Sequence, residues 1–412
     1  MRALSAFYLK ASAIKASVWQ VFVIVFLHGL SSALPFGLIT LGVQNWYLTQ
    51  NQNLTNLAWL SLIAQVYLFK FLWGHVCDNH CLYGTQKRKS WILTMQAIMV
   101  LLIALLSFIS FEHRLGVMIV IALIGFASAT QDLCIDAYRS ELMAHHRLYQ
   151  KYIALSYIVG FRLGYLMTGA GILLIAHFIN WQFSYQLIAG CMMICMLATI
   201  YSTEHSITTT QTSLNRWQAI QTILAKKHIK LFLSFIFLYE FGDSLISAVL
   251  VNFLASVKHY SLLTIALQVK TANLISLFLS PIIMLVFLNY ASLSTLLLLG
   301  LVSEALILSS LWYASDSMSI LFWSQLALGL FEGMLGALIL NVYTYLADGE
   351  SGAFNYAFIA AVGGLKSLVT PSLAVLIIKC LSWPMLFLIG TLLTLPGCYL
   401  VILLRPELKK IF

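Results

Sequence analysis

Long apolar stretches follow one another along almost the whole chain, with only short polar breaks between them. A helix needs about 20 apolar residues to cross the hydrocarbon layer of a membrane. Such stretches lie near residues 18–43, 57–77, 91–111, 115–138, 152–176, 183–201, 229–254, 263–288, 293–313, 318–346, 353–379 and 383–404. The sequence therefore predicts an all-α integral membrane protein with about twelve transmembrane helices.

The composition leaves no room for a soluble domain of useful size. Apolar residues make up 61% of the chain and charged residues only 9%, whereas soluble domains are about half apolar and about a quarter charged. The net charge is +9, but we do not expect the protein to bind nucleic acid, because no soluble domain is left to carry a basic face. Most cysteines lie in or at the ends of apolar stretches, so we expect no disulfide framework.

The N-terminal segment carries basic residues before its apolar stretch, as a signal peptide does. These are Arg2, Lys10 and Lys15. The apolar stretch that follows is too long for a signal peptide, and no small-residue cleavage site closes it. We therefore expect an uncleaved first transmembrane helix.

The loop charges predict how the chain is oriented. Cytoplasmic loops of membrane proteins are enriched in Lys and Arg. With the N-terminus in the cytoplasm, most loop cations fall on that side, among them Lys87, Arg88, Lys89, Arg139, Arg147, Lys151, Arg216, Lys226, Lys227, Lys230, Arg405, Lys409 and Lys410. The opposite side holds only Arg114, Lys258 and Lys379. Both termini are therefore predicted to be cytoplasmic.

One longer polar stretch, residues 202–228, divides the chain into two sets of six spans, 1–201 and 229–412. The two sets share weak similarity, such as Gln65-Val66 before Lys70 in the first and Gln268-Val269-Lys270 in the second. A repeat of this kind, combined with the six-plus-six layout, favours the major facilitator fold with its two six-helix bundles.

The loop after the second span resembles the signature loop of major facilitator transporters. It has Gly74, Asp78, Gly84 and then the basic cluster Lys87-Arg88-Lys89. Asp78 can pair with a cation or face a helix N-terminus, and we expect Arg139, at the end of span four, to be the cation. Such a pair would lock the cytoplasmic side. The loop's His and Cys residues do not complete a paired metal-ligand spacing, so neither a metal nor a cofactor is predicted.

Charged residues inside apolar spans are costly in hydrocarbon and usually functional. An α-helix rises about 1.5 Å per residue, which gives the depth of each charged residue in its span. The charged residues near the membrane midplane are Arg162, Glu240, Glu304, Glu332 and Lys366, and His28 and Asp243 lie close to that depth. Lys70 lies somewhat nearer the cytoplasm. Binding sites of secondary transporters lie at this depth between the repeats.

The midplane acids are candidates for proton coupling. Glu240 and Asp243 are three residues apart and share one helix face. Burial and like charge favour the protonated form of at least one of them. We interpret Glu240, Asp243 and Glu332 as the coupling candidates; the alternative is an internal salt bridge to Arg162 or Lys366. For Glu304, on a span that usually lies outside the cavity, we expect a structural partner.

The midplane cations are candidates for substrate binding. Arg162 cannot lose its proton, so at this depth it must face a substrate carboxylate, an acidic side chain or water. A permanent salt bridge to a midplane acid remains open for Arg162, and a structural ion pair remains open for Lys70. We assign Arg162, Lys366 and Lys70 to the substrate, together with His28 and Gln131 as hydrogen-bonding groups.

Span four ends with two acids on one face, Asp132 and Asp136, close to Arg139. We assign these three residues, with Asp78, to a cytoplasmic gate. Paired carboxylates also occur in acid–base enzymes, but no nucleophile, metal cluster or cofactor motif accompanies them here. We therefore do not expect the protein to be an enzyme.

Several strings match one known family. They are Leu34-Pro35, Gln65-Val66-Tyr67-Leu68-Phe69-Lys70-Phe71-Leu72-Trp73, Ala129-Thr130-Gln131-Asp132 with Asp136-Ala137-Tyr138-Arg139, Gly160-Phe161-Arg162-Leu163-Gly164 with Asn180-Trp181-Gln182, and Leu238-Tyr239-Glu240-Phe241-Gly242-Asp243. The chain resembles the AmpG-type muropeptide permeases of the major facilitator superfamily, with Glu240 where that family usually has Lys.

This resemblance implies proton-driven import of anhydro-muropeptides, which are cell-wall recycling fragments, across a bacterial inner membrane. The small-molecule substrate, protons and membrane lipid would then be its partners. Related transporters of acetyl-CoA share the pattern, so transport of another polar anionic solute is the alternative. A transport-dead sensor fits the intact midplane charges less well, and the absence of a reactive constellation disfavours a membrane-embedded transferase.

Overall fold

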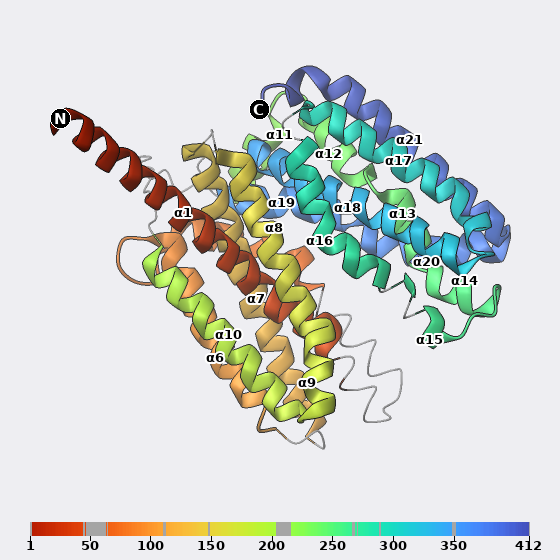
Figure 1. Cartoon of the computed structure of the whole chain (residues 1–412), viewed down its shortest axis with the longest axis horizontal. Helices are drawn as coiled ribbons and strands as arrows, with labels where there is room; N and C mark the ends of the chain where they lie inside the picture. Colours follow the sequence, from red (N-terminus) through yellow and green to blue (C-terminus); the bar gives the residue numbers. More distant parts are fainter. Residues whose placement is uncertain are drawn as a thin grey trace. The chain divides into compact units, whose positions relative to one another are not determined.

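The computed structural model describes residues 2–43, 46, 63, 65–109, 113–146, 149–202, 216–265, 268–269, 271–287, 290–347 and 352–411. These residues form helices joined by turns (Figure 1). The chain divides into two compact units. The first unit comprises Met1–Asn215 and Asp348–Ala357, and the second comprises Arg216–Ala347 and Phe358–Phe412. The central part of the predicted linker lies outside the described residues.

Within the described residues, ten helical segments are long and apolar enough to cross a membrane. They are Trp19–Gly42, Lys87–Leu106, Leu115–His145, Gln150–Phe178, Trp181–Tyr201, Ile229–Ser256, Leu293–Ala314, Met318–Ala347, Gly352–Cys380 and Trp383–Leu408. Each coincides with a predicted span, which confirms an all-α, multi-pass membrane protein. The predicted spans 57–77 and 263–288 include residues outside the described part. In the first of these regions the structure describes α4 (Val66–Phe69) and α5 (Phe71–Asn79). In the second it describes α15 (Leu262–Ile265) and α16 (Thr271–Phe287).

The first unit is built around α1 (Arg2–Gly37) and its π-helical extension η1 (Leu38–Gly42). The other long helices of this unit are α6 (Lys87–Leu106), α7 (Arg114–His145), α8 (Gln150–Leu166) and α10 (Trp181–Tyr201). The α8 helix continues through a π-helical turn, η3 (Met167–Gly171), into α9 (Ile172–Phe178). Helices α1 and α8 pack backbone against backbone, since a Cβ on Gly160 would lie 1.9 Å from the Phe26 carbonyl oxygen. Small residues permit such close packing between membrane helices.

The second unit contains α11 (Arg216–Leu224), α12 (Ile229–Leu238), α13 (Phe241–Ser247), α14 (Leu250–Ser256), α17 (Leu293–Ala314) and α18 (Met318–Ala347). It also contains α20 (Lys366–Cys380), α21 (Trp383–Leu408) and the later part of α19 (Gly352–Gly364). A Cβ on Gly242 would lie 2.0 Å from the Gly390 carbonyl oxygen. Glycine therefore brings α13 directly onto α21, and this contact positions the residues that flank Gly242.

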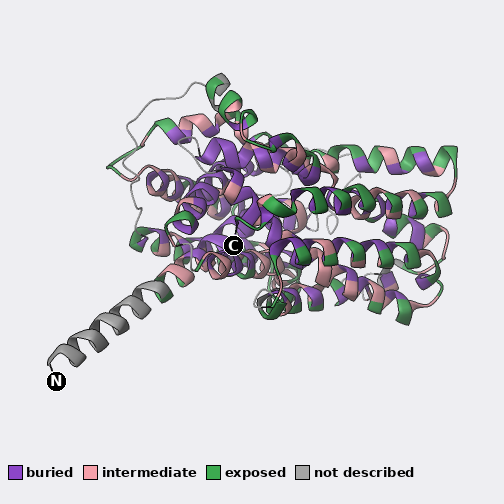
Figure 2. Cartoon of the chain, turned by 90° about the horizontal axis from the view of Figure 1, so that it is seen from above, coloured by how far each residue is buried: buried purple, intermediate pink, exposed green. Residues whose placement is uncertain are grey.

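Large apolar side chains cover much of the outer surface of the helices. Leu101 is 70% exposed, Phe178 79% and Trp323 65%. Figure 2 shows exposed and buried positions alternating along the helices. A soluble protein rarely exposes so many large apolar side chains, whereas helices in lipid do, because hydrocarbon is their solvent.

Candidate substrate, coupling and gate sites

The seventh span is interrupted in its middle. Helix α12 ends at Leu238 and α13 begins at Phe241, with Tyr239 extended (ψ 137°) and Glu240 in the left-handed region (φ 54°) between them. A non-glycine residue rarely adopts this conformation, and such strain is concentrated at functional sites. The break leaves the Tyr239 carbonyl outside the helical hydrogen-bond ladder. Discontinuous helices of this kind form the binding sites of many secondary transporters.

Lys366 occupies this break from a second interrupted helix. It begins α20, directly after α19 has ended before Leu365. Its Nζ donates a hydrogen bond to the Tyr239 carbonyl oxygen at 2.8 Å and lies 3.5 Å from Glu240 Oε2. The ammonium also stands 4.0 Å from the centre of the Tyr239 ring, within range of a cation–π interaction. The predicted alternative of a salt bridge between a midplane acid and Lys366 is therefore realised for Glu240.

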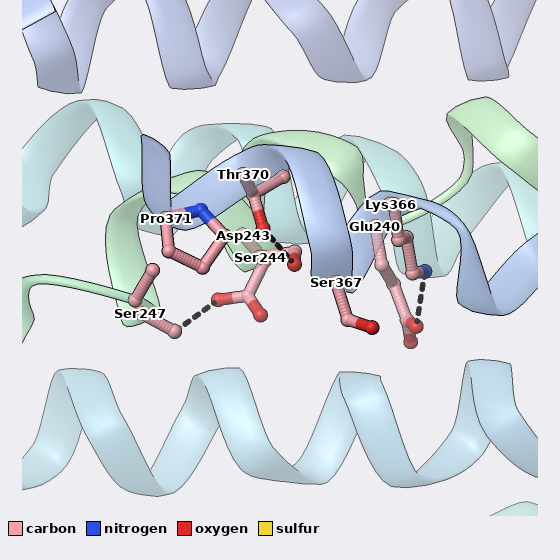
Figure 3. Close-up of a pocket in the computed structure, with 9 residues that line it drawn as sticks. Glu240, Asp243, Ser244, Ser247, Lys366, Ser367, Thr370 and Pro371 are labelled. Atoms are coloured by element: carbon pink, nitrogen blue, oxygen red, sulfur yellow. Dashed lines mark hydrogen bonds and ion pairs between the residues drawn. The ribbon is translucent and has the colours of Figure 1, made fainter. Parts of the chain in front are cut away.

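Glu240 and Lys366 lie at one side of a pocket of about 410 Å³ in the second unit (Figure 3). Asp243 lies farther along the same pocket, where its Oδ1 accepts a hydrogen bond from Ser247 at 3.1 Å. Hydroxyls and small side chains complete the lining: Ser244, Ser247, Ala248, Ser367, Thr370 and Pro371. Two carboxylates, one ammonium and several hydroxyls suit a polar, charged solute.

Two further acids lie close to this pocket. Asp243 is in hydrogen-bonding contact with Glu332 of α18. Glu304 of α17 is 0% exposed, and neither of its carboxyl oxygens has a hydrogen-bond partner among the described residues. We expected a structural partner for Glu304; among the described residues no side chain supplies one, and the backbone of Asp243 is the group that approaches its carboxyl. Three of the four acids in this region, Glu240, Asp243 and Glu332, are the predicted coupling residues.

A compact ion network lies in the first unit. The Nζ of Lys70 lies 2.5 Å from Asp132 Oδ2 and 2.8 Å from Asp136 Oδ2. Asp136 also pairs with Arg139 at 3.0 Å. Tyr157 donates to Asp132 at 3.2 Å, and its ring centre lies 4.1 Å from the Arg139 guanidinium. The network holds two cations and two anions, so its charges cancel. Lys70 thus forms the structural ion pair that the sequence analysis named as the alternative for it. Its role in substrate binding stays a prediction.

Asp78 does not pair with Arg139, so this part of the predicted gate was wrong. Its Oδ1 instead lies 2.7 Å from Nη2 of Arg88. Arg139 is held by Asp136, three residues earlier on α7, and by the hydroxyl of Tyr356, to which it donates at 2.5 Å. Asp136 lies one helical turn before Arg139 on α7, so Arg139 pairs with an acid of its own helix, which explains the different pairing.

Asp78 does face a helix N-terminus, which was the other contact that the sequence analysis considered for it. Its two carboxylate oxygens accept hydrogen bonds from the backbone N–H groups of Ala353 and Phe354, at 3.2 and 2.9 Å. Both N–H groups lie in the first turn of α19, where the helix dipole favours a negative charge. Asp78 and Arg139 thus both contact the short segment Asp348–Ala357, which belongs to the first unit.

His28 and Gln131 lie buried in the first unit, at 1% and 0% exposure. The Nε2 atom of His28 is 3.2 Å from the Thr199 hydroxyl, and Gln131 donates to the Ser31 hydroxyl at 2.7 Å. His28 Nδ1 and Gln131 Oε1 have no hydrogen-bond partner within the described part of the chain. Both side chains therefore retain hydrogen-bonding capacity, but their assignment to the substrate stays a prediction.

Arg162 is half-buried on α8, between Gly160 and Gly164. It takes part in interactions within the structure, and its assignment to a substrate carboxylate also stays a prediction. Lys270 lies outside the described residues.

The sequence did not single out several residues of these sites. Arg88 was visible only as one of three consecutive cations, and spacing alone could not choose among them. Tyr157 and Tyr356 carry no charge, and Tyr356 reaches Arg139 from 217 residues away. One of the pocket hydroxyls has a usable signal, because Ser247 lies four residues after Asp243 and shares its face of α13.

Curated proteins resemble this chain over almost its full length. The anhydromuropeptide permease of Escherichia coli (strain K12) is 24% identical over 396 residues, which cover 94% of this chain and 80% of that protein. A transporter of Rickettsia conorii named AmpG 1 is 24% identical over 415 residues, covering 94% and 98%. An uncharacterized protein of Haemophilus influenzae is 29% identical over 297 residues, covering 70% and 69%. No protein-family model matches the chain.

Proposed function

The chain belongs to the family of AmpG-type permeases, and from this premise we propose that it imports anhydro-muropeptides. Import would occur by alternating access within a major facilitator fold and would be driven by protons. The observation that carries the proposal is the pocket of about 410 Å³ at the interrupted seventh span, lined by carboxylates, an ammonium and hydroxyls. A disaccharide-peptide offers many hydroxyls, together with charged groups on its peptide, and such a lining can bind both.

We assign substrate recognition to Arg162, Lys366, Lys70, His28 and Gln131. An arginine binds a carboxylate with two parallel hydrogen bonds, which suits the peptide part of a muropeptide. Lys366 is the member of this set that lines the pocket. Its 3.5 Å ion pair with Glu240 is longer than a charge-assisted hydrogen bond of about 2.8 Å, so a substrate carboxylate can compete with Glu240 for Lys366.

Proton coupling is assigned to Asp243, Glu332 and Glu240. Two carboxyl groups in contact cannot both be ionised at low cost, because their charges repel each other in a medium of low dielectric. The contact between Asp243 and Glu332 therefore favours one shared proton. Substrate binding next to this pair can change how firmly the proton is held, which is the physical requirement for coupling.

The gate is assigned to Asp78, Arg139, Asp132 and Asp136. Asp78 and Arg139 hold the start of α19 through the backbone of Ala353 and Phe354 and through Tyr356. Opening a cytoplasmic entrance would require these contacts to break. Because each donor and acceptor regains water when exposed, the contacts can break and re-form reversibly.

Uptake into proteoliposomes tests the proposed function. The purified full chain should accumulate a labelled anhydro-muropeptide when the lumen is more alkaline than the outside. A panel of peptides, sugar conjugates and acyl-coenzyme A would compete for uptake. Equal uptake by protein-free vesicles, or a clear preference for another anion in the panel, would contradict muropeptide import and favour the alternative solute.

Reporter fusions test the proposed orientation in a bacterial inner membrane, with its lipid as the surrounding solvent. Fusions after Gln86, Gln211 and Lys409 should report the cytoplasm, whereas a fusion after Asn53 should report the outside, because most loop cations lie on the first side. A cytoplasmic signal at Asn53 would refute this topology.

Neutral amides test the coupling residues. We expect Asp243→Asn and Glu332→Gln each to reduce accumulation against a gradient by about 100-fold, because an amide cannot bind and release a proton. Exchange of labelled for unlabelled substrate should continue, since it needs no net proton movement. Asp316→Asn removes an exposed acid that pairs with Lys258 and serves as the control. Normal accumulation by both single variants would exclude these acids as coupling sites.

A further inference from the structure

Glu304 is a buried carboxyl group that none of the preceding assignments uses. It lies on α17 and is 0% exposed, no side chain among the described residues donates a hydrogen bond to either of its oxygens, and the backbone of Asp243 is the group that approaches them. An ionised carboxylate without a partner is far more costly to bury than a neutral acid. In the conformation described here, Glu304 is therefore expected to carry a proton.

The charged groups near Glu304 belong to three neighbouring segments of the second unit. Glu240 and Asp243 of the interrupted seventh span, Glu332 of α18 and Lys366 of α20 interact electrostatically with it. The thiol of Cys398 is the nearby titratable group on α21. Among the described residues, the groups with the largest electrostatic effect on Glu304 include acids of the pocket region and one cation, Lys366. Lys366 makes its direct contacts with Glu240 and the Tyr239 carbonyl, so it acts on the charge of Glu304 without a direct ion pair.

We propose that Glu304 is a proton-holding residue of the coupling site, which exchanges its proton with the pair Asp243 and Glu332. This inference rests on the proposed proton coupling. In the exchange, the O–H bond of Glu304 breaks and an O–H bond forms on Asp243 or Glu332, so that the total charge of the cluster is unchanged. The pair can then release a proton toward one side of the membrane and regain one from Glu304. The cluster thereby avoids holding several neighbouring carboxylates ionised at once.

A purely structural role makes a different prediction. A buried acid that only fills space is replaced almost perfectly by the neutral amide of glutamine. A residue that exchanges a proton is not, because an amide has no proton to give at neutral pH. Glu304→Gln therefore separates the two roles with little change in volume.

Transport supplies the first measurement, with the full chain in proteoliposomes and a labelled anhydro-muropeptide as the probe. We expect Glu304→Gln to reduce accumulation driven by a pH gradient by about tenfold or more, while substrate exchange at equal pH stays within about twofold of the natural chain. Glu304→Asp, which keeps a titratable group, should restore part of the accumulation. Asp316→Asn is again the matched control. Accumulation by Glu304→Gln equal to that of the natural chain overturns the proposal.

Infrared spectroscopy of the protein without substrate supplies the second measurement. The natural chain should show absorption from a protonated carboxyl group at neutral pH, and Glu304→Gln should lose part of that absorption. Asp316→Asn should leave it unchanged. An unchanged protonated-carboxyl band in Glu304→Gln also overturns the proposal. This measurement needs no substrate. It therefore tests whether Glu304 is protonated even if the protein does not take up muropeptides and the proposed function is wrong.

Discussion

We expect the Lys70→Met variant to be less stable than the natural chain by about 3–5 kcal/mol. Lys70 is the cation that Asp132 and Asp136 share, at 2.5 and 2.8 Å, and its side chain is only 6% exposed. Methionine preserves much of the length and the apolar stem but leaves two buried carboxylates with Arg139 as their nearest cation. Removing one member of a buried ion pair is costly because the charge that remains has no compensation. Unfolding of the purified protein in detergent, followed by circular dichroism, measures the change.

A double variant shows whether charge is the cause. Lys70→Met with Asp132→Asn removes one charge of each sign and leaves the Asp136–Arg139 pair intact. We expect it to recover most of the stability lost in the single variant, and the difference from additivity gives the coupling between the two residues. If Lys70→Met alone unfolds like the natural chain, the network does not stabilise this unit. Lys70 would then be available for the substrate, as its original assignment states.

The positions of the spans could be read from the sequence because hydrocarbon imposes a simple requirement. Every backbone group must be paired within the helix, so an apolar stretch of sufficient length has few alternatives. The spans at 183–201 and 293–313, for example, correspond to α10 and α17 within two residues at each end. This rule acts residue by residue along the chain and needs no knowledge of which helices become neighbours.

The break at Glu240 could not be read in the same way. Glutamate is a good helix former, and its neighbours Phe241 and Gly242 do not mark a turn. The unusual backbone is accompanied by contacts from another helix, since Lys366 binds the freed Tyr239 carbonyl and approaches the Glu240 carboxylate. Local propensity is thus overridden by a pairing between residues that are 126 positions apart.

The same reasoning explains why one predicted contact of Asp78 was correct and the other was wrong. That Asp78 would face a helix N-terminus follows from its chemistry, because a carboxylate accepts hydrogen bonds from free N–H groups. Which arginine it would pair with depends on the path of each side chain. Arg88 is nearer in sequence and approaches from the start of α6, whereas Arg139 is engaged by Asp136 and Tyr356.

The contacts of Asp78 lead to the other large expected effect. We expect Asp78→Ala to shift the chain away from the conformation described here by about 100-fold. The substitution removes the ion pair with Arg88 and the acceptor for the N–H groups of Ala353 and Phe354. Hydrogen bonds to a charged group contribute about 1.5–3 kcal/mol each, and about 2.8 kcal/mol corresponds to a 100-fold change in an equilibrium.

Two native cysteines report this shift without any added label site. Cys77 is buried and Cys380 is exposed, so the rate at which a maleimide modifies Cys77 in membranes measures how often this region opens. Asp78→Ala should raise that rate by about 100-fold and leave Cys380 unchanged. Asp78→Asn should have an intermediate effect, because it keeps an oxygen that accepts one N–H but loses the charge that Arg88 needs. Slow labelling of Cys77 in Asp78→Ala, as in the natural chain, would mean that the start of α19 is held by other contacts, and Asp78 would then have no role in the gate.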